Sequence, residues 1–263
     1  MTPGLAQATP LGQATIGYNP HVAGHLYLSP HLDDAVLSCG GLIASQVAAG
    51  EAVVVLTACA GDPPPGPLSD FAQELLLRWG KGSVPSPARR AEDRMACGRL
   101  GASVLHLDVP DAIYRRQADG AVLYPSERAI FGPLHLADKP LIDSLAAKIA
   151  AACTEDSRLY SPLGIGNHVD HRLTRLAAER ARGGLWYYPD FPYIARGGAS
   201  PDLPAPPGQK VVLPLSSEEV QTWAAAAAEY ASQISTFWSD VYALYEEVRD
   251  YAGRTGGIEL IAP

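Results

Sequence analysis

Short apolar runs alternate with longer segments of helical spacing along most of the chain. The run at 25–29 predicts a first strand, and the β-branched run at 52–59 predicts a strand that is buried on both faces. Apolar residues three and four apart within 34–50 predict a helix that ends at Gly50. The same criteria predict strands at 103–108, 158–164, 185–190 and 210–215, and helices at 71–80, 88–101, 140–153 and 170–184. The stretch 216–252 is predicted to be mostly helical.

The segments between these elements are irregular. Loops are predicted at 1–22, 61–70, 81–87, 110–138 and 201–209, because these stretches are rich in Gly and Pro or lack a clean period. Strands that alternate with helices are typical of an α/β fold. We therefore expect a Rossmann-like, open and mostly parallel sheet with helices on both faces. We expect one domain over 1–263, in which 1–22 is a lead-in and about 200–263 is a helical and strand extension packed on the core.

Composition and charge exclude several classes of protein. Hydrophobic residues make up 47% of the 263 positions, which is enough for a sizeable core. The net charge of −8 argues against a nucleic-acid partner, which needs a basic face. None of the four cysteines is in a CxxC spacing, so we expect free thiols and no thiolate metal site. Neither a secretory signal nor a membrane-spanning run is recognisable, so we expect a soluble cytoplasmic protein.

Two clusters of ionisable side chains follow predicted strands and open predicted helices. The clusters are His31, Asp33 and Asp34, and His168, Asp170 and His171. Open α/β sheets keep their ligand sites at the carboxyl ends of the strands. In a sheet of order 3-2-1-4-5 the first and fourth strands are neighbours, so we expect both clusters to face one crevice.

The spacing within each cluster favours a metal site. His31 and Asp34 are three residues apart, as are His168 and His171, so each pair can point the same way on a first helical turn. We assign His31, Asp34 and His171 as the ligands of one Zn²⁺ per chain, since two imidazoles and a carboxylate leave a fourth position open for water. Another divalent metal is compatible with the same donors.

The other three residues are assigned to proton transfer and charge stabilisation. Asp33, beside the metal, takes a proton from water and passes it to the leaving group. A protonated His168 stabilises an oxyanion, and Asp170 orients it through the second ring nitrogen. The alternative for a single aspartate is a helix cap, and for a single histidine a surface or core position. Two such clusters at strand-to-helix turns favour the metal site.

The quoted motifs resemble those of a known enzyme family. "PHLDD" followed by "CGG", and "NHVDHR", are similar to the two signature motifs of the LmbE-like (PIG-L) deacetylases. The resemblance implies a zinc-dependent enzyme that removes an N-acyl group, usually acetyl, from an N-acetylglucosamine-type sugar in a small molecule or glycoconjugate. Weaker similarities are "TACAGDP", "RRAEDRMACGRLGA" and "YASQI", and together the matches cover most of 25–235. The chain has Ala35 where many members have glutamate, a position with no role assigned here.

The resemblance also implies substrate contacts. It places Arg89 near the pocket, although a surface ion pair with Asp93 explains this arginine equally well. Tyr188, Asp190 and Tyr193, in "WYYPDFPY", are candidates for lining a sugar pocket, since aromatic faces stack on sugar rings, and they fit core or edge packing of a strand equally well. Tyr187 in the same stretch is expected to be a core residue. The expected partner is a small amino-sugar conjugate, and the sequence leaves open a homo-oligomer.

Other functions remain as alternatives. A metal-dependent phosphoesterase also uses His and Asp clusters, but it usually needs two metals and more carboxylates. A non-catalytic sugar-binding protein of the same fold would be expected to have lost Asp33 or a ligand. A dinucleotide-binding oxidoreductase would need a GxGxxG turn after the first strand, and this chain has none there.

Overall fold

The computed structural model describes residues 24–78 and 86–263. The predicted lead-in at 1–22 and most of the predicted loop at 81–87 lie outside the described residues. The strands are β1 (His25–Ser29), β2 (Val53–Thr57), β3 (Ser103–His106), β4 (Arg158–Pro162), β5 (Trp186–Tyr188), β6 (Gln209–Leu213) and β7 (Ile258–Ala262). The α-helices are α1 (Asp34–Ala48), α2 (Asp70–Arg78), α3 (Ser86–Leu100), α4 (Glu127–Ile130), α5 (Lys139–Ala152), α6 (Val169–Ala181), α7 (Ser217–Ala227), α8 (Ala231–Phe237) and α9 (Val241–Thr255).

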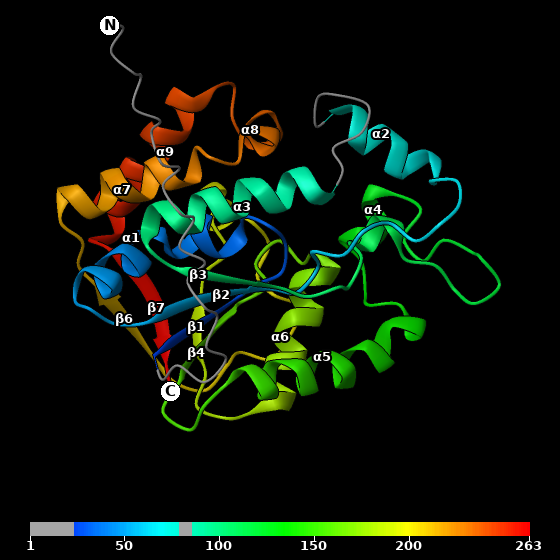
Figure 1. Cartoon of the computed structure of the whole chain (residues 1–263), viewed down its shortest axis with the longest axis horizontal. Coiled ribbons are helices and arrows are strands. Elements are labelled where there is room, and N and C mark those ends of the chain that lie inside the picture. The colour runs from blue at the N-terminus through cyan, green and yellow to red at the C-terminus, as the bar shows by residue number, and fades with distance from the viewer. Residues whose placement is uncertain (1–23, 79–85) are drawn as a thin grey trace, which may run out of the picture.

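The strands form one sheet in the order β3-β2-β1-β4-β5-β7-β6. The first five in the chain pair in parallel, while β7 runs antiparallel to both β5 and β6. In the centre of the sheet, Tyr27 of β1 pairs with Val55 of β2 and with Tyr160 of β4. The predicted class, a mostly parallel sheet with helices on both faces, is confirmed (Figure 1).

Alternate residues of the central strands face two separate cores. Tyr27 packs into a core under α1, α3 and α7, whereas Leu26 and Leu28 pack into a second core under α5 and α6. Both sides of β1 are therefore buried, as successive side chains of a strand point to opposite faces. Burial on both faces explains why the strand appears in the sequence as an unbroken apolar run.

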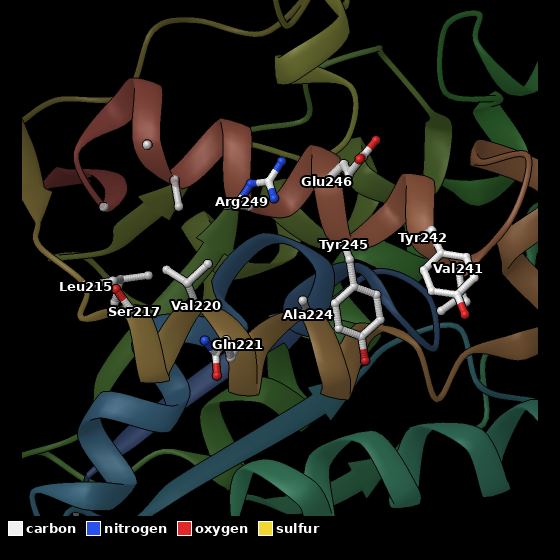
Figure 2. A pocket seen from close by; sticks show the side chains of 13 residues that line it. Leu215, Ser217, Val220, Gln221, Ala224, Val241, Tyr242, Tyr245, Glu246 and Arg249 are labelled. Atoms are coloured by element: carbon white, nitrogen blue, oxygen red, sulfur yellow. The ribbon is translucent and has the colours of Figure 1, made fainter.

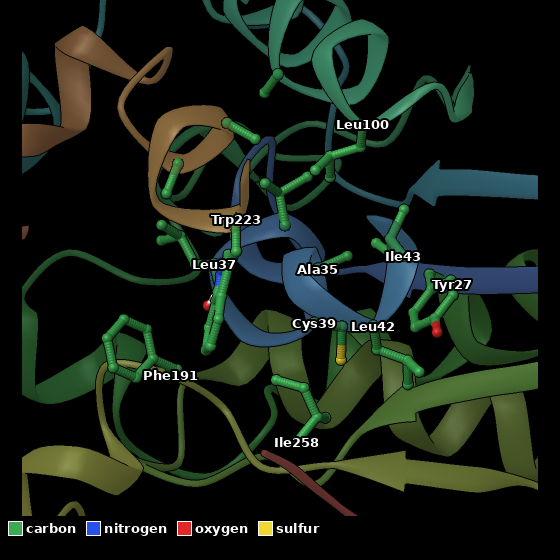
Figure 3. Close-up of a cluster of buried hydrophobic side chains, with 14 of the residues drawn as sticks. Tyr27, Ala35, Leu37, Cys39, Leu42, Ile43, Leu100, Phe191, Trp223 and Ile258 are labelled. Atoms are coloured by element: carbon green, nitrogen blue, oxygen red, sulfur yellow. Dashed lines mark hydrogen bonds between the residues drawn. The ribbon is translucent and has the colours of Figure 1, made fainter. Parts of the chain in front are cut away.

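Helix α7 packs closely against α1 because the middle of α1 consists of small residues. A Cβ atom at Gly40 would lie 2.4 Å from Cδ1 of Trp223. The indole is fully buried, and its Nε1 donates a hydrogen bond of 3.1 Å to the carbonyl oxygen of Leu37 (Figure 3). The C-terminal part of the chain thus packs directly on the helix that carries Asp34 in its first turn.

The C-terminal stretch 216–252 was predicted to be mostly helical, and it contains the three helices α7, α8 and α9. Asp240 starts the last one, because its side chain accepts a hydrogen bond of 3.0 Å from the amide of Ala243. Strand β7 was not predicted at all.

The predicted insertion at 110–138 is largely irregular, with short helical turns at Ala112–Tyr114, Glu127–Ile130 and Leu136–Asp138.

Candidate metal centre

The two predicted clusters meet at one edge of the sheet. Strands β1 and β4 are hydrogen-bonded neighbours, and each leads into the turn before α1 or α6. The turn after β4 contains positive φ values at Gly164 (84°), Gly166 (88°) and Asn167 (67°). Glycine tolerates this backbone region without strain, and asparagine adopts it more readily than most residues. The turn delivers His168 and the start of α6 to the end of β1, which confirms the predicted adjacency of the strands.

Two imidazole nitrogens and one carboxylate oxygen converge in this crevice. Oδ2 of Asp34 lies 3.1 Å from Nδ1 of His31 and 3.4 Å from Nε2 of His171. Asp34 and His171 are buried, and the side chain of His31 is 13% exposed. These atoms belong to the three residues that the sequence assigned as ligands. The groups of possible metal donors that come closest together among the described residues are instead His31 with His168 and His171, and His31 with Asp111 and Asp170.

The outer nitrogen of each ring is held by a further carboxylate. Nε2 of His31 lies 3.0 Å from Oδ2 of Asp170, and Nδ1 of His171 lies 2.6 Å from Oδ1 of Asp190. A proton on each outer nitrogen leaves the inner nitrogen with a lone pair directed toward Asp34. Ring nitrogens that bind metals are usually backed in this way, so the donor set fits a divalent metal ion.

The charges around the two rings favour a cation between them. Burial lowers the pKa of His31, but Asp170 and Asp34 outweigh it and raise that pKa well above the usual value. Burial also lowers the pKa of His171, but Asp34 and Asp190 outweigh burial and raise that pKa above its usual value. Burial would raise the pKa of Asp34, yet His171 and His31 hold it below its ordinary value. Carboxylates that stabilise a proton here stabilise a metal ion in its place.

Asp33 lies next to these donors and differs from Asp34 in its charge environment. Burial and the neighbouring Asp34 raise the pKa of Asp33 to about 7, against the opposing effect of Arg89. Nη2 of Arg89 is 3.7 Å from Oδ2 of Asp33. Asp93, the alternative partner considered for Arg89, is not at the surface: it is 1% exposed and accepts hydrogen bonds from Tyr230 (2.6 Å) and His106 (2.7 Å).

The predicted contact between Asp170 and His168 is also wrong. Nδ1 of His168 accepts a hydrogen bond of 3.2 Å from the backbone amide of Asp170, while the Asp170 carboxylate is turned toward His31. A ring that accepts at Nδ1 is neutral and carries its proton on Nε2. Burial and the nearby His31 lower the pKa of His168 well below its usual value, in agreement with a neutral ring. A protonated Nε2 has no lone pair for a metal, although His168 lies close to both other histidines.

A second acidic group lies on the outer side of His31. Asp111, Asp170 and His31 come close enough to hold a cation together. However, the Asp170 carboxylate already has a buried counter-charge, since its Oδ1 lies 2.6 Å from Nη1 of Arg115. A cation at this position would compete with that guanidinium for Asp170.

A cavity of about 540 Å³ is lined by His31, Asp33, Asp34 and His168. Tyr193 lies on its wall, edge-on to His171 at 6.0 Å between ring centroids and to Phe237 at 5.9 Å. Arg89 lines it as well, so both predicted substrate contacts face the cavity. Apolar residues from the 110–138 segment and from α2 complete the wall, namely Leu75, Ile113, Ile130 and Phe131.

A larger cavity of about 900 Å³ lies elsewhere, between α7 and α9 (Figure 2). Its charged lining residues are Glu246 and Arg249, and Tyr242 and Tyr245 stand along one side. Histidine, cysteine and aspartate do not occur among the described residues that line it. Of these two cavities, only the smaller one is lined by histidine and aspartate side chains in the described part of the chain.

The family assignment follows from a match to a family model over residues 26–182. That model is described as "PIG-L: GlcNAc-PI de-N-acetylase" and spans both ligand motifs. The chain belongs to the PIG-L family.

Relatives within and around the PIG-L family are similar in sequence and fold. A 2'-N-acetylparomamine deacetylase of Niallia circulans is 32% identical over 188 residues, which is 64% of this chain and 66% of that protein. The zinc-inhibited form of teicoplanin deacetylase Orf2 has a TM-score of 0.79 at 28% identity, covering 91% of this chain and 97% of the other. The A40926 pseudoaglycone deacetylase Dbv21 has a TM-score of 0.73 at 30% identity, covering 92% and 96%. The chain spans 66% and 59% of the length of the curated relatives that it matches.

Some residues of this PIG-L centre were not assigned from the sequence. Asp190 was considered only as a possible sugar contact or packing residue. Its Oδ2 accepts hydrogen bonds from the amides of Gly164 (2.7 Å) and Ile165 (2.8 Å), while its Oδ1 contacts Nδ1 of His171. Arg115 was not considered, because it lies in the segment without a clean period.

Among the described residues, no helix is both long and apolar enough to cross a membrane.

Proposed function

We propose that this PIG-L family member is a metal-dependent deacetylase that hydrolyses the N-acetyl amide of an amino sugar in a small glycoconjugate. The observation that carries the proposal is the convergence of His31, Asp34 and His171, each ring backed by a carboxylate, beside an aspartate with a pKa raised to about 7. Deacetylases of 2'-N-acetylparomamine and teicoplanin type among the relatives support the reaction class.

The proposed ligands of the metal are Nδ1 of His31, Oδ2 of Asp34 and Nε2 of His171. A Zn²⁺ ion in such a site acts as a Lewis acid toward a carbonyl oxygen and makes water more acidic. The three donors fit Zn²⁺ because imidazole and carboxylate together are typical of catalytic zinc sites. We propose one such ion per chain.

Asp33 is the proposed proton acceptor. A general base works best when its pKa lies near the working pH, and burial with the neighbouring Asp34 brings Asp33 into that range. The same carboxyl group, once protonated, returns the proton to the nitrogen of the leaving amine. Positioned proton transfer of this kind contributes roughly 10²–10⁴-fold to the rate.

Neutral His168 is the proposed donor to the developing oxyanion. Because Nδ1 accepts from the backbone amide of Asp170, the Nε2–H group is left to donate. We thus propose hydrogen bonding by a neutral ring in place of the protonated ring expected from the sequence. Asp170 is proposed to act on His31 and not on His168.

The substrate is proposed to be amphiphilic, with a sugar next to apolar groups. The cavity combines Arg89 and several carboxylates near the metal donors with an apolar wall of Ile130, Phe131 and Phe237. Tyr193, at the boundary between the two, is the proposed ring-stacking contact. This arrangement suits an N-acetylated amino sugar attached to a less polar aglycone.

The test is acetate release by the purified chain from 2'-N-acetylparomamine and from N-acetylglucosaminyl conjugates, with and without a chelator. We expect acetate release that the chelator abolishes and added Zn²⁺ restores, and about one bound metal by elemental analysis. Asp33→Asn should keep the metal and lose about 10²–10⁴-fold in activity. The exposed Asp143, which pairs with Arg180, provides a control, and Asp143→Asn should leave activity unchanged.

Three results would overturn the proposal. The first is a folded protein that binds no divalent metal and releases no acetate from the panel. The second is release of phosphate from an ester such as p-nitrophenyl phosphate without release of acetate, which would favour a phosphoesterase. A protein that binds the sugars without turnover, while holding metal, would instead point to a sugar-binding role.

A further inference from the structure

Asp170 makes three polar contacts, and two of them come from the irregular segment at 110–138. Its Oδ2 accepts from the backbone amide of Ala112 (2.9 Å) and lies 3.0 Å from Nε2 of His31. Its Oδ1 lies 2.6 Å from Nη1 of Arg115. Asp170 is completely buried, so these groups fix both the place and the charge of its carboxylate.

Arg115 is itself held from several sides. It is 6% exposed, its Nε donates to Oδ2 of Asp138 (2.9 Å), and its Nη1 donates to the carbonyl oxygen of Pro110 (3.1 Å). The guanidinium also lies over the ring of Tyr124, 5.3 Å from its centroid, and the Tyr124 hydroxyl donates to the same Asp138 oxygen (2.7 Å). Arg115 is therefore held between two buried carboxylates, those of Asp138 and Asp170.

We propose that Arg115 is a positioning residue of the metal centre: it anchors the Asp170 carboxylate, which in turn holds the His31 ring with Nδ1 toward Asp34. The inference rests on the proposed metal site and extends it by a residue that touches neither metal nor substrate. On this proposal the 110–138 segment both lines the cavity and, through Arg115 and Asp170, orients the ligand His31.

Loss of the guanidinium leaves a buried carboxylate without its counter-charge, and such a group does not keep its place. The His31 ring then loses a fixed partner for its outer nitrogen. Changes to groups that orient metal ligands typically weaken metal binding by about 10–100-fold. A purely electrostatic role predicts the opposite, because removing a nearby positive charge tightens binding of a cation.

The experiment measures the Kd for Zn²⁺ by chelator competition, and thermal unfolding of the metal-free protein, for Arg115→Met and for the control Arg116→Met. Arg116 is the neighbouring arginine, and its contacts are to the carbonyl oxygens of Gly120 and Pro67 on the surface. We expect a Kd about 10–100-fold higher for Arg115→Met and an unchanged Kd for Arg116→Met. In an Asp170→Asn background, Arg115→Met should add little, since the route through Asp170 is already cut.

An unchanged or lower Kd in folded Arg115→Met overturns the inference, and so does full additivity with Asp170→Asn. If Arg115→Met does not fold, Arg115→Lys replaces it. Lysine keeps the charge but cannot reach Asp170 and Asp138 with a planar fork, so an intermediate rise in Kd supports the inference and a wild-type Kd refutes it. Absence of Zn²⁺ binding by the wild-type protein would instead refute the proposed function.

Discussion

Arg89 lies beside the carboxylate that we propose as the proton acceptor, and its removal tests how that carboxylate is charged. Nη2 of Arg89 is 3.7 Å from Oδ2 of Asp33, and both groups are largely buried. The arginine lowers the pKa of Asp33 against the larger effect of burial. In Arg89→Gln this opposing charge is lost, so the pKa of Asp33 must rise.

The size of the shift follows from the distance. Two unit charges 3.7 Å apart interact by about 1 kcal/mol in a medium like water and by about 4 kcal/mol at an effective dielectric constant of ~20. One pKa unit corresponds to about 1.4 kcal/mol, so the expected rise is about one to three units. The base must be deprotonated to work, and the acidic limb of activity therefore moves to higher pH.

The assay is the pH dependence of kcat/KM for acetate release, with the metal bound in both proteins so that the difference reports Arg89 alone. At pH values below both midpoints the variant should be at least about tenfold slower, and at high pH it should approach the wild type. Arg89→Lys keeps a cation and should stay near the wild-type midpoint. The control is Arg90→Gln, since Arg90 pairs with Asp62 away from Asp33.

One pattern would refute this reasoning. If kcat/KM of Arg89→Gln falls by the same factor at every pH, with the midpoint unchanged, Arg89 does not control the charge of Asp33. The arginine would then be a substrate contact, as expected from the sequence, and the acidic limb would belong to another group.

Three further predictions concern ligand support, packing and substrate binding. Asp190→Ala removes the partner of a ligand histidine and should raise the Kd for Zn²⁺ about 10–100-fold in chelator competition. Gly40→Ala forces a Cβ atom against Trp223 and should cost about 1–3 kcal/mol in urea unfolding, whereas Gly98→Ala, which meets nothing within 4 Å, should stabilise its helix by roughly 0.5–1 kcal/mol. Tyr193→Phe should keep the melting temperature but lower kcat/KM for the sugar about 2–10-fold if the hydroxyl contacts substrate; an unchanged value would leave ring stacking as its role.

The parallel part of the fold could be predicted because its signals are local. Buried strands such as β2 are continuous apolar runs, and the helices between them show a 3.6-residue period. The C-terminal part could not be predicted in the same way. The breaks between its helices lie near Tyr230, whose hydroxyl donates to the distant Asp93, and near Trp238, whose indole donates to Glu247. Strand β7 depends on pairing with β5 and β6, which no local pattern reports.

At the site, residue types and positions could be predicted better than hydrogen-bond partners. Strand order brought both clusters together, but Asp170 was expected to face His168, two positions before it. Residues two apart at the start of a helix do not face each other, and Asp170 accordingly points to His31 across the crevice. The support from Asp190 and Arg115 comes from other segments, so spacing within the two motifs carries no information about it.

The proposed ligands lie at the ends of two adjacent parallel strands, so their positions depend on the sheet, whereas part of the cavity wall does not. His31, Asp34 and His171 depend on β1, β4 and the first turns of two helices, all fixed by the sheet. Part of the cavity wall comes from α2 and α8, which contribute neither the proposed ligands nor the carboxylates that contact them. Changes in α2 and α8 can therefore alter which molecules the cavity accommodates while the proposed ligands beneath them keep their positions.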